Sequence, residues 1–376
     1  MTISARSISM VVIAGLLAGA CGKGSSSSAS SATTTTVAPS PAANPAYAKA
    51  GPYPASFHTL RAGTRPVDVF LPGQPGSEKD HKQAWYDIRA PERPPSAPAE
   101  PTPVAEQVTI PAYRDLPPAL GPFPVVLFSH GYGAQPLVNA TLEADLASWG
   151  FVVIAPDHVE RDTYALITNH ATSNNTRDAA VLHTAMLAAA RDPAVGPYMK
   201  LSQVAAVGHS QGGGTALAAL SRRDVKAAVA WASTVPSTPL PSKPVMLIGA
   251  QHDLEFGASV QQSIYARLTG RRALVLLGGG AGHATFVDEC EGLRASGQLT
   301  PGGDERDPQN PGGLLELAQN GCYPDEVDPL VAWPVITHFT VAFLRSAFGI
   351  DKQPVGLGDG IARAFPMLPL TYEHHP

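Results

Sequence analysis

Short apolar runs recur along the chain, and each ends at glycine or polar residues. The clearest of them occupy residues 124–129, 204–207, 227–230, 244–248 and 273–277. Apolar runs of this length, bounded by turn residues, are typical of buried strands. An alternating stretch at residues 64–71 predicts an earlier strand, and the small residues 213–220 predict a helix. We therefore expect a sheet whose strands end at polar or glycine-rich loops.

One of these loops carries a Gly-x-Ser-x-Gly motif. Gly208-His209-Ser210-Gln211-Gly212 lies between the run at 204–207 and the expected helix. In a nucleophile elbow the strand turns sharply into a helix, so the serine is strained and side chains two residues away on either side would collide. The motif alone is weak evidence, but its placement between strand and helix supports it. We predict that Ser210 is a catalytic nucleophile.

A serine nucleophile needs a histidine that takes its proton and a carboxylate that orients the imidazole. In proteins with this elbow the chain order is serine, acid, histidine. Asp253 follows the run at 244–248, and His283 follows the run at 273–277 after a glycine-rich turn. Both residues therefore belong at the same sheet edge as Ser210, and we predict the triad Ser210, Asp253 and His283.

Several further histidines and acids could fill these roles. His130 and His209 sit inside glycine motifs, where shaping the loop is the simpler role. His338 belongs to an expected C-terminal helix, where packing is the simpler role. Asp157 ends an earlier strand, and Asp288 comes after His283, so both fit the expected chain order less well than Asp253.

The oxyanion of a tetrahedral intermediate requires two fixed N–H donors. The backbone N–H of Gln211 follows the nucleophile, and the turn His130-Gly131-Tyr132-Gly133 follows an early strand. We assign the second donor to Tyr132. Gly133 is the alternative donor, and a simple tight turn without a catalytic role is the alternative interpretation.

These motifs resemble a known group of enzymes. The sequence is similar to cutinase-like polyesterases, dienelactone-hydrolase-type proteins and platelet-activating-factor acetylhydrolases in segments 128–134, 145–153 and 208–214 and at Asp253 and His283. The resemblance extends over about residues 67–348. It implies an α/β-hydrolase fold, with a mostly parallel central sheet flanked by helices on both faces. It also implies hydrolysis of carboxylic esters through an acyl-enzyme intermediate.

The chain departs from this group in three ways. Dienelactone hydrolases use a cysteine nucleophile where this chain has Ser210, so their substrate does not transfer. Polyesterases of the cutinase type have an aromatic clamp, which Tyr132 and Trp231 can form here, although Trp231 fits a core position equally well. Residues 288–329 are longer than a compact polyesterase needs, so this segment can cover or narrow the active site.

Composition excludes several functions. The 376 residues are 44% apolar and 15% charged, which allows one large globular domain. A net charge of −5 without a basic stripe argues against nucleic-acid binding. Residues 278–282 lack nucleotide-loop spacing, which indicates that no nucleotide cofactor binds there. We expect no cofactor and no metal. The expected partner is a small or polymeric ester, and the expected state is a monomer.

A non-catalytic binding protein on the same scaffold is the competing class of function, and the complete triad argues against it.

The N-terminal segment predicts export. Residues 1–21 contain Arg6, a short apolar core and Ala18-Gly19-Ala20-Cys21, which resembles a bacterial lipobox. We predict a lipid anchor on Cys21 and a location in the bacterial cell envelope, either periplasmic or at the cell surface. Because Ala18 replaces the usual leucine, ordinary secretion is the alternative.

The domain boundaries follow from composition. Residues 22–52, rich in Ser, Thr, Ala and Pro, predict a disordered tether. The catalytic domain is expected at residues 53–376, with insertions at about 72–118 and 288–329. The first insertion includes a proline-rich stretch at 91–103.

Two cysteines remain once Cys21 is assigned to lipid. Cys290 and Cys322 form an even pair in an exported chain, where disulfides persist. No Cys-x-x-Cys or clustered His/Cys spacing indicates a metal site. We predict a disulfide that staples the segment after His283.

Overall fold

A computed structural model describes residues 43–87, 107–236, 238–296, 299 and 314–376. The predicted targeting segment with Cys21, most of the expected tether and the proline-rich stretch 91–103 lie outside the described residues.

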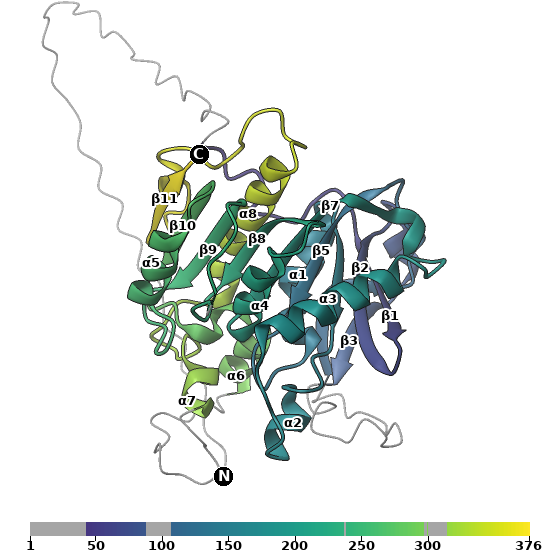
Figure 1. Ribbon diagram of the computed structural model, residues 1–376, viewed down its shortest axis with the longest axis horizontal. Coiled ribbons are helices and arrows are strands. Elements are labelled where there is room, and N and C mark those ends of the chain that lie inside the picture. The colour runs from purple at the N-terminus through teal and green to yellow at the C-terminus, as the bar shows by residue number, and fades with distance from the viewer. Residues whose placement is uncertain (1–42, 88–106, 237, 297–298, 300–313) are drawn as a thin grey trace, which may run out of the picture. The chain divides into compact units, whose positions relative to one another are not determined.

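The described residues form one eleven-stranded sheet (Figure 1). Its spatial order is β11-β10-β9-β8-β7-β5-β6-β2-β1-β4-β3. Six of the ten neighbouring pairs are parallel, including every pair from β10 to β6. The strands in chain order are β1 (Ala55–Ala62), β2 (Arg65–Pro72), β3 (Gln83–Asp87), β4 (Gln107–Arg114), β5 (Phe123–Ser129), β6 (Val152–Pro156), β7 (Met199–His209), β8 (Val225–Trp231), β9 (Val245–Ala250), β10 (Arg272–Leu277) and β11 (Leu370–His375). The prediction of a mostly parallel sheet is confirmed.

Helices cover both faces of this sheet (Figure 1). Successive side chains of a strand point to opposite faces, so Val126 and Phe128 of β5 pack with one set of helices and Val125 and Leu127 with the other. The first set is α1 (Ala140–Ser148) and α8 (Pro329–Ala347), and the second is α3 (Asn175–Ala189), α4 (Gln211–Ala219) and α5 (Ala258–Arg267). Because both faces are buried, the central strands are continuous apolar runs.

The five apolar runs correspond to β5, β7, β8, β9 and β10, and the expected helix after the elbow is α4. The alternating stretch at 64–71 forms most of β2. Its partner β1 and the C-terminal strand β11 were not predicted from the sequence.

Part of the expected tether is packed against the domain. The ring of Tyr47 is buried edge-on against Trp149, with ring centroids 4.8 Å apart, and its hydroxyl donates to Asp351 at 2.6 Å. Arg345 lies over the same ring, 5.3 Å from its centroid. The folded domain therefore begins before Tyr53, because the Tyr47 ring inside the Ala/Pro-rich segment is buried against Trp149 and Arg345.

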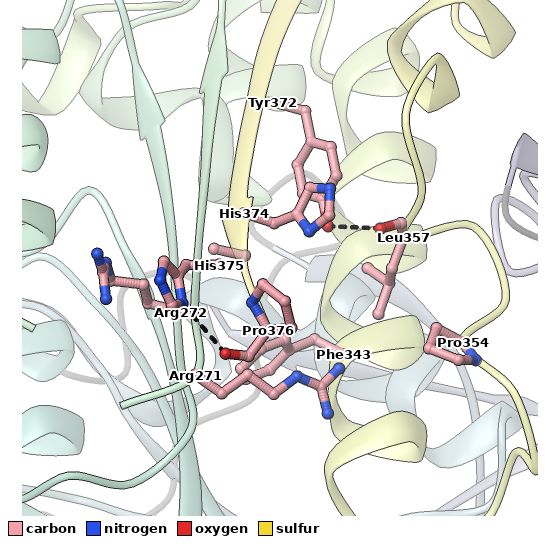
Figure 2. Close-up of a pocket in the computed structure, with 10 residues that line it drawn as sticks. Arg271, Arg272, Phe343, Pro354, Leu357, Tyr372, His374, His375 and Pro376 are labelled. Carbon is pink, nitrogen blue, oxygen red and sulfur yellow. Dashed lines mark hydrogen bonds between the residues drawn. The ribbon is translucent and has the colours of Figure 1, made fainter. Parts of the chain in front are cut away.

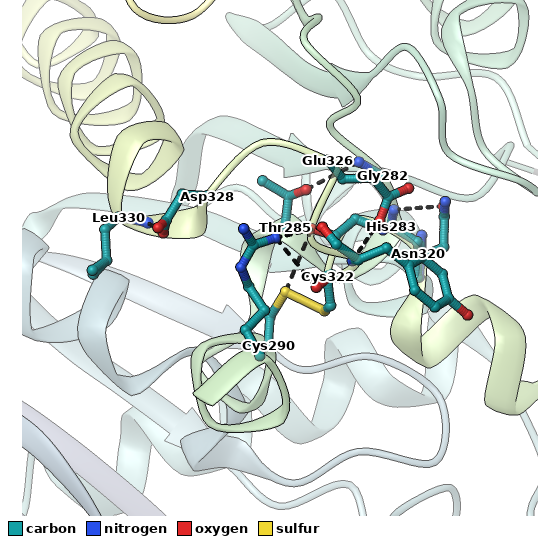
Figure 3. Close-up of a disulfide and its surroundings, with 12 residues drawn as sticks. Gly282, His283, Thr285, Cys290, Asn320, Cys322, Glu326, Asp328 and Leu330 are labelled. Atoms are coloured by element: carbon teal, nitrogen blue, oxygen red, sulfur yellow. Dashed lines mark hydrogen bonds between the residues drawn. A yellow bond between two sulfur atoms is a disulfide. The ribbon is translucent and has the colours of Figure 1, made fainter. Parts of the chain in front are cut away.

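The two expected insertions have different structures. In the first, β3 and β4 extend the sheet at its edge beyond β1. In the second, the predicted disulfide joins Cys290, in the first turn of α6 (Glu289–Ser296), to Cys322, which follows α7 (Leu314–Gln319); the two Cα atoms are 5.2 Å apart (Figure 3). Both cysteines are fully buried. The short helices α2 (Thr163–Ile167), α6 and α7 lie at the edge where the central parallel strands end (Figure 1).

Helix α8 is apolar because it is a core helix. Among the described residues it is the one helix long and apolar enough to cross a membrane, but 67% of its apolar window is buried. Its side chains pack against β8 and β9 and against α1. Packing therefore accounts for its composition.

Candidate active site

Ser210 occupies a strained turn between β7 and α4. Its φ of 56° and ψ of −123° are rare for a residue with a side chain, and such strain persists only where surrounding structure enforces it. A Cβ on Gly212 would lie 1.9 Å from the Ser129 carbonyl oxygen, and one on Gly208 would lie 2.2 Å from the Gly212 carbonyl oxygen. Only glycine fits at either position. This is the geometry expected of a nucleophile elbow.

Asp253 and His283 form a buried pair. The Nδ1 atom of His283 lies 2.8 Å from Oδ2 of Asp253, while Oδ1 of Asp253 accepts the backbone N–H groups of Phe256 (2.8 Å) and Glu255 (3.0 Å). Burial raises the pKa of Asp253, but the hydrogen bond and charge of His283, together with these N–H groups, outweigh it and leave the pKa below its usual value. An ionised Asp253 accepts from Nδ1, which leaves Nε2 of His283 free to take a proton.

The three candidate residues lie at one edge of the sheet. Ser210 follows β7, Asp253 follows β9 and His283 begins the short 3₁₀ turn after β10, and β7, β8, β9 and β10 are parallel neighbours. His209 links the elbow to the base: its ring lies 4.8 Å from the His283 ring, and its Nε2 is 3.1 Å from the His283 carbonyl oxygen. All three candidate side chains are nearly buried, with 6 to 7% of each residue exposed.

His209 itself is unsuited to act as the base. Burial, and after it the charge of His283, lowers the pKa of His209 to about 3, so the ring is neutral at physiological pH. A neutral ring that donates Nε2–H to the His283 carbonyl oxygen fixes the position of the His283 backbone. His209 therefore shapes the site, as its place in a glycine motif predicts.

Three of the other candidates for base or acid are engaged in different interactions, namely His130, His338 and Asp288. Nδ1 of His130 lies 2.9 Å from the Gly131 carbonyl oxygen, while its Nε2 accepts the His158 N–H at 2.9 Å. Burial lowers the pKa of His130. His338 is buried in α8, where burial lowers its pKa to about 4. The carboxylate of Asp288 accepts the Thr141 N–H at 3.0 Å.

The two expected oxyanion donors have no hydrogen-bond acceptor among the described residues. Within the described part of the chain, no hydrogen bond engages the backbone N–H of Tyr132 or of Gln211. The N–H of Gly133, the alternative donor, is bonded to the Arg161 carbonyl oxygen at 2.8 Å. This bond favours Tyr132 over Gly133.

Trp231 does not line a cleft, and the interpretation of this residue as part of an aromatic clamp is wrong. It is fully buried, its indole Nε1–H donates to Thr340 Oγ1 at 3.1 Å, and its ring packs against Phe128 and Phe286. The side chain leaves the end of β8 toward α8, on the face of the sheet that α1 and α8 cover. Tyr132 remains partly exposed.

Two further residues contact the candidate base His283 and were not predicted from the sequence. The Phe256 ring is partly exposed and 5.6 Å from the His283 ring. The side-chain oxygen of Asn320 accepts the N–H groups of His283 (2.9 Å) and Leu254 (3.2 Å), and its carbonyl oxygen accepts the Ala284 N–H at 2.6 Å (Figure 3). The sequence feature that could have indicated Asn320 is its position two residues before Cys322. The predicted disulfide from Cys322 to Cys290 brings this segment close to His283.

A separate pocket of about 350 Å³ lies away from these residues (Figure 2). Arg271 and Arg272 line it at the start of β10, with Phe343 of α8 and Tyr372 of β11. The triad residues follow the opposite ends of the parallel strands. Among the described residues no group of three His, Cys, Asp or Glu side chains could hold a metal ion.

Comparison with known proteins agrees with this fold. The sequence model of the chlorophyllase family matches residues 95–241, a region that includes Ser210 but stops before Asp253 and His283. A ferulic acid esterase from Streptomyces cinnamoneus has a similar structure, with a TM-score of 0.64 and 22% sequence identity over 88% of this chain and 98% of that one. No curated protein matches. The structural match shows a shared α/β fold with a mostly parallel sheet, and the family match covers less than half of this chain.

Proposed function

We propose that this protein hydrolyses carboxylic esters with Ser210 as nucleophile, His283 as general base and Asp253 as the group that orients His283. The observation that carries the proposal is the strained elbow of Ser210 at the same sheet edge as the hydrogen-bonded Asp253–His283 pair. A strained serine costs free energy, and such strain clusters at active sites.

The reaction proceeds in two steps. His283 Nε2 takes the Ser210 hydroxyl proton as Oγ attacks the ester carbonyl carbon, and the N–H groups of Tyr132 and Gln211 stabilise the oxyanion. The alcohol then leaves with the proton from His283, which gives an acyl-enzyme. Water, deprotonated by His283, attacks the acyl carbon and releases the acid and free Ser210.

The substrate range is the finer part of the proposal. The partly exposed Phe256 ring lies beside His283, and the partly exposed Tyr132 follows Gly131, which lies close to Ser210. Both side chains suit an apolar or aromatic acyl group. The similar ferulic acid esterase is in line with this chemistry. We propose a cutinase-like esterase that also accepts polyesters. A lipase or platelet-activating-factor acetylhydrolase-like enzyme is the second candidate, and a non-catalytic binding protein is the candidate from another class.

We also propose that Cys21 carries a lipid that anchors the protein in the bacterial envelope, because Ala18-Gly19-Ala20-Cys21 ends an apolar leader. A Cys21→Ser variant expressed in a bacterium should move from the membrane fraction to the soluble fraction. Wild-type protein found only in the medium would support ordinary secretion instead.

The activity is tested with p-nitrophenyl esters from acetate to palmitate, beside an aromatic polyester film. The exported domain and its Ser210→Ala variant are compared. Turnover of short chains and release of film products support a polyesterase, whereas preference for long chains supports a lipase. A folded wild-type protein that neither turns over esters nor reacts with a serine-directed phosphonate is a binding protein.

A further inference from the structure

A buried arginine, Arg161, contacts the loop that carries the candidate oxyanion donor Tyr132. Arg161 is fully buried, and its Nε donates to Oδ2 of Asp178 in α3 at 2.7 Å. Its Nη1 donates to the carbonyl oxygens of His130 (2.7 Å) and Gly131 (2.6 Å), and its Nη2 donates to Ser129 Oγ at 2.9 Å. Three of these four bonds reach the end of β5 and the turn after it.

The arrangement is more specific than charge pairing alone requires. A buried guanidinium must be paired and hydrogen-bonded, and Asp178 supplies the pairing charge. Two donors of one nitrogen are directed at consecutive backbone carbonyls of the loop. The planar fork of an arginine can hold such fixed directions, whereas an ammonium group is a point charge. Arg161 therefore fixes the backbone orientation of this turn.

The bond to Gly131 determines where the Tyr132 N–H points. The peptide group that joins Gly131 to Tyr132 is planar and trans, so its C=O and N–H point in opposite directions. Because Arg161, together with His130 Nδ1, holds the C=O, the Tyr132 N–H faces away from Arg161. The elbow is close to this turn, since a Cβ on Gly131 would lie 3.5 Å from the Ser210 Cβ.

The next peptide is fixed by the same residue. The Gly133 N–H donates to the Arg161 carbonyl oxygen at 2.8 Å, and the Thr163 hydroxyl donates to the Gly133 carbonyl oxygen at 3.0 Å. The carbonyls of His130 and Gly131 and both polar groups of Gly133 are thus bonded. The Tyr132 N–H, between them, is left without an acceptor among the described residues.

We propose that Arg161 is a positioning residue that orients the Tyr132 N–H toward the oxyanion formed at Ser210. The inference rests on the ester hydrolysis proposed above. Arg161 touches no reacting atom and acts through the Gly131–Tyr132 peptide. Polarisation of that carbonyl by the guanidinium also makes the N–H at the other end of the peptide a stronger donor.

The test compares Arg161→Lys with the matched control Arg177→Lys. Arg177 also pairs with Asp178, at 3.0 Å, but its Nη1 and Nη2 donate to Thr172, away from the oxyanion loop. Loss of one oxyanion donor costs about 10² to 10³ in rate. With a p-nitrophenyl ester that the wild type hydrolyses, we expect Arg161→Lys to lower kcat by roughly 10- to 100-fold with KM changed less than about threefold, because a displaced donor is weakened and not removed.

A second readout separates positioning from general structure. The affinity for an aryl boronic acid, which forms a tetrahedral adduct on Ser210, should fall by the same factor as kcat/KM. The affinity for the carboxylic acid product should stay unchanged. Millimolar guanidinium added to Arg161→Ala should restore part of kcat. Arg177→Lys should leave all these quantities as in the wild type.

Each outcome decides between the two proposals. A folded Arg161→Lys protein with wild-type kcat and boronic-acid affinity would overturn the positioning role while ester hydrolysis stands. A wild-type protein without Ser210-dependent turnover would overturn both. If Arg161→Lys does not fold, Asp178→Asn takes its place, because it removes the charge that pairs with Arg161 and so loosens the guanidinium. Parallel losses of kcat and boronic-acid affinity in that variant support the role, and a loss of stability alone overturns it.

Discussion

Removal of the Cys290–Cys322 disulfide is expected to lower the free energy of unfolding without disabling the folded site. The crosslink joins residues separated by 32 positions. In the chain-entropy model a loop of that length restricts the unfolded chain by about 12 cal/mol/K, or ~3.7 kcal/mol at 25 °C. A large domain loses about 2 °C in Tm per kcal/mol, so the expected decrease is roughly 6–8 °C.

The activity of the folded variant should change little, because the contacts that hold His283 do not depend on the S–S bond. Asn320 keeps its bonds to the N–H groups of His283, Leu254 and Ala284 as long as the fold is intact. Urea unfolding and ester turnover are measured on Cys290→Ala/Cys322→Ala and on reduced wild-type protein. The reduced protein is the matched control, since it loses the crosslink but retains both sulfur atoms.

Two results would refute this reasoning. Equal unfolding free energies for oxidised and reduced protein would mean that the crosslink does not restrict the unfolded chain. A kcat at 25 °C more than tenfold below that of the oxidised protein, with the fold intact, would mean that the disulfide acts on the site directly.

Three further predictions concern other parts of the molecule. Asn320→Ala should lower kcat by roughly 10-fold or more and destabilise the fold, because it leaves the N–H groups of His283 and Leu254 without their acceptor, and an unsatisfied buried N–H costs about 1–3 kcal/mol. Asn320→Asp keeps the acceptor oxygen and should retain most of the turnover. Equal losses of turnover in both variants would contradict this. Gly212→Ala should abolish turnover, because its Cβ would lie 1.9 Å from the Ser129 carbonyl oxygen, while Gly292→Ala in α6, with no described atom within 4 Å of the new Cβ, should stabilise the protein by about 0.5–1 kcal/mol in thermal unfolding. Burial raises the pKa of Asp68 from 3.8 to about 7. Between these pH values the folded protein binds more protons than the unfolded chain, so the contribution of Asp68 to stability falls as pH rises. Asp68→Asn should therefore be more stable than the wild type at pH 8 by roughly 1–3 kcal/mol in urea unfolding, and a difference in stability that does not shrink toward pH 4 would show that the carboxyl is not the cause.

Much of the central sheet could be predicted from the sequence because strands buried on both faces are continuous apolar runs. The same runs located the loops, so the positions of Ser210, Asp253 and His283 at one edge followed from parallel order alone. The outer strands β1 and β11 escaped prediction because they are edge or near-edge strands with mixed burial. Their residues carry no continuous apolar pattern.

Features that depend on side-chain direction could not be predicted. Trp231 ends an apolar run at the sheet edge that carries the candidate triad, and only the pleat of β8 decides that its ring points into the core. Tyr47 lies in a segment of disordered composition, and its burial depends on a partner site built from Trp149 and Arg345. Arg161 has no sequence signal, because its role is defined by three bonds to the end of β5 and the turn after it.

Asn320 and Arg161 stabilise the candidate site from two sides, and both do so by hydrogen bonds to backbone groups. Asn320 holds the N–H groups of His283 and Leu254 on the side of the base, and Arg161 holds the carbonyls of His130 and Gly131 on the side of the oxyanion. Backbone atoms held in this way are insensitive to the identity of the side chains that face the substrate. Changes at such partly exposed positions should therefore alter which ester is accepted more than how fast an accepted ester reacts, because the groups that stabilise the transition state would stay in place.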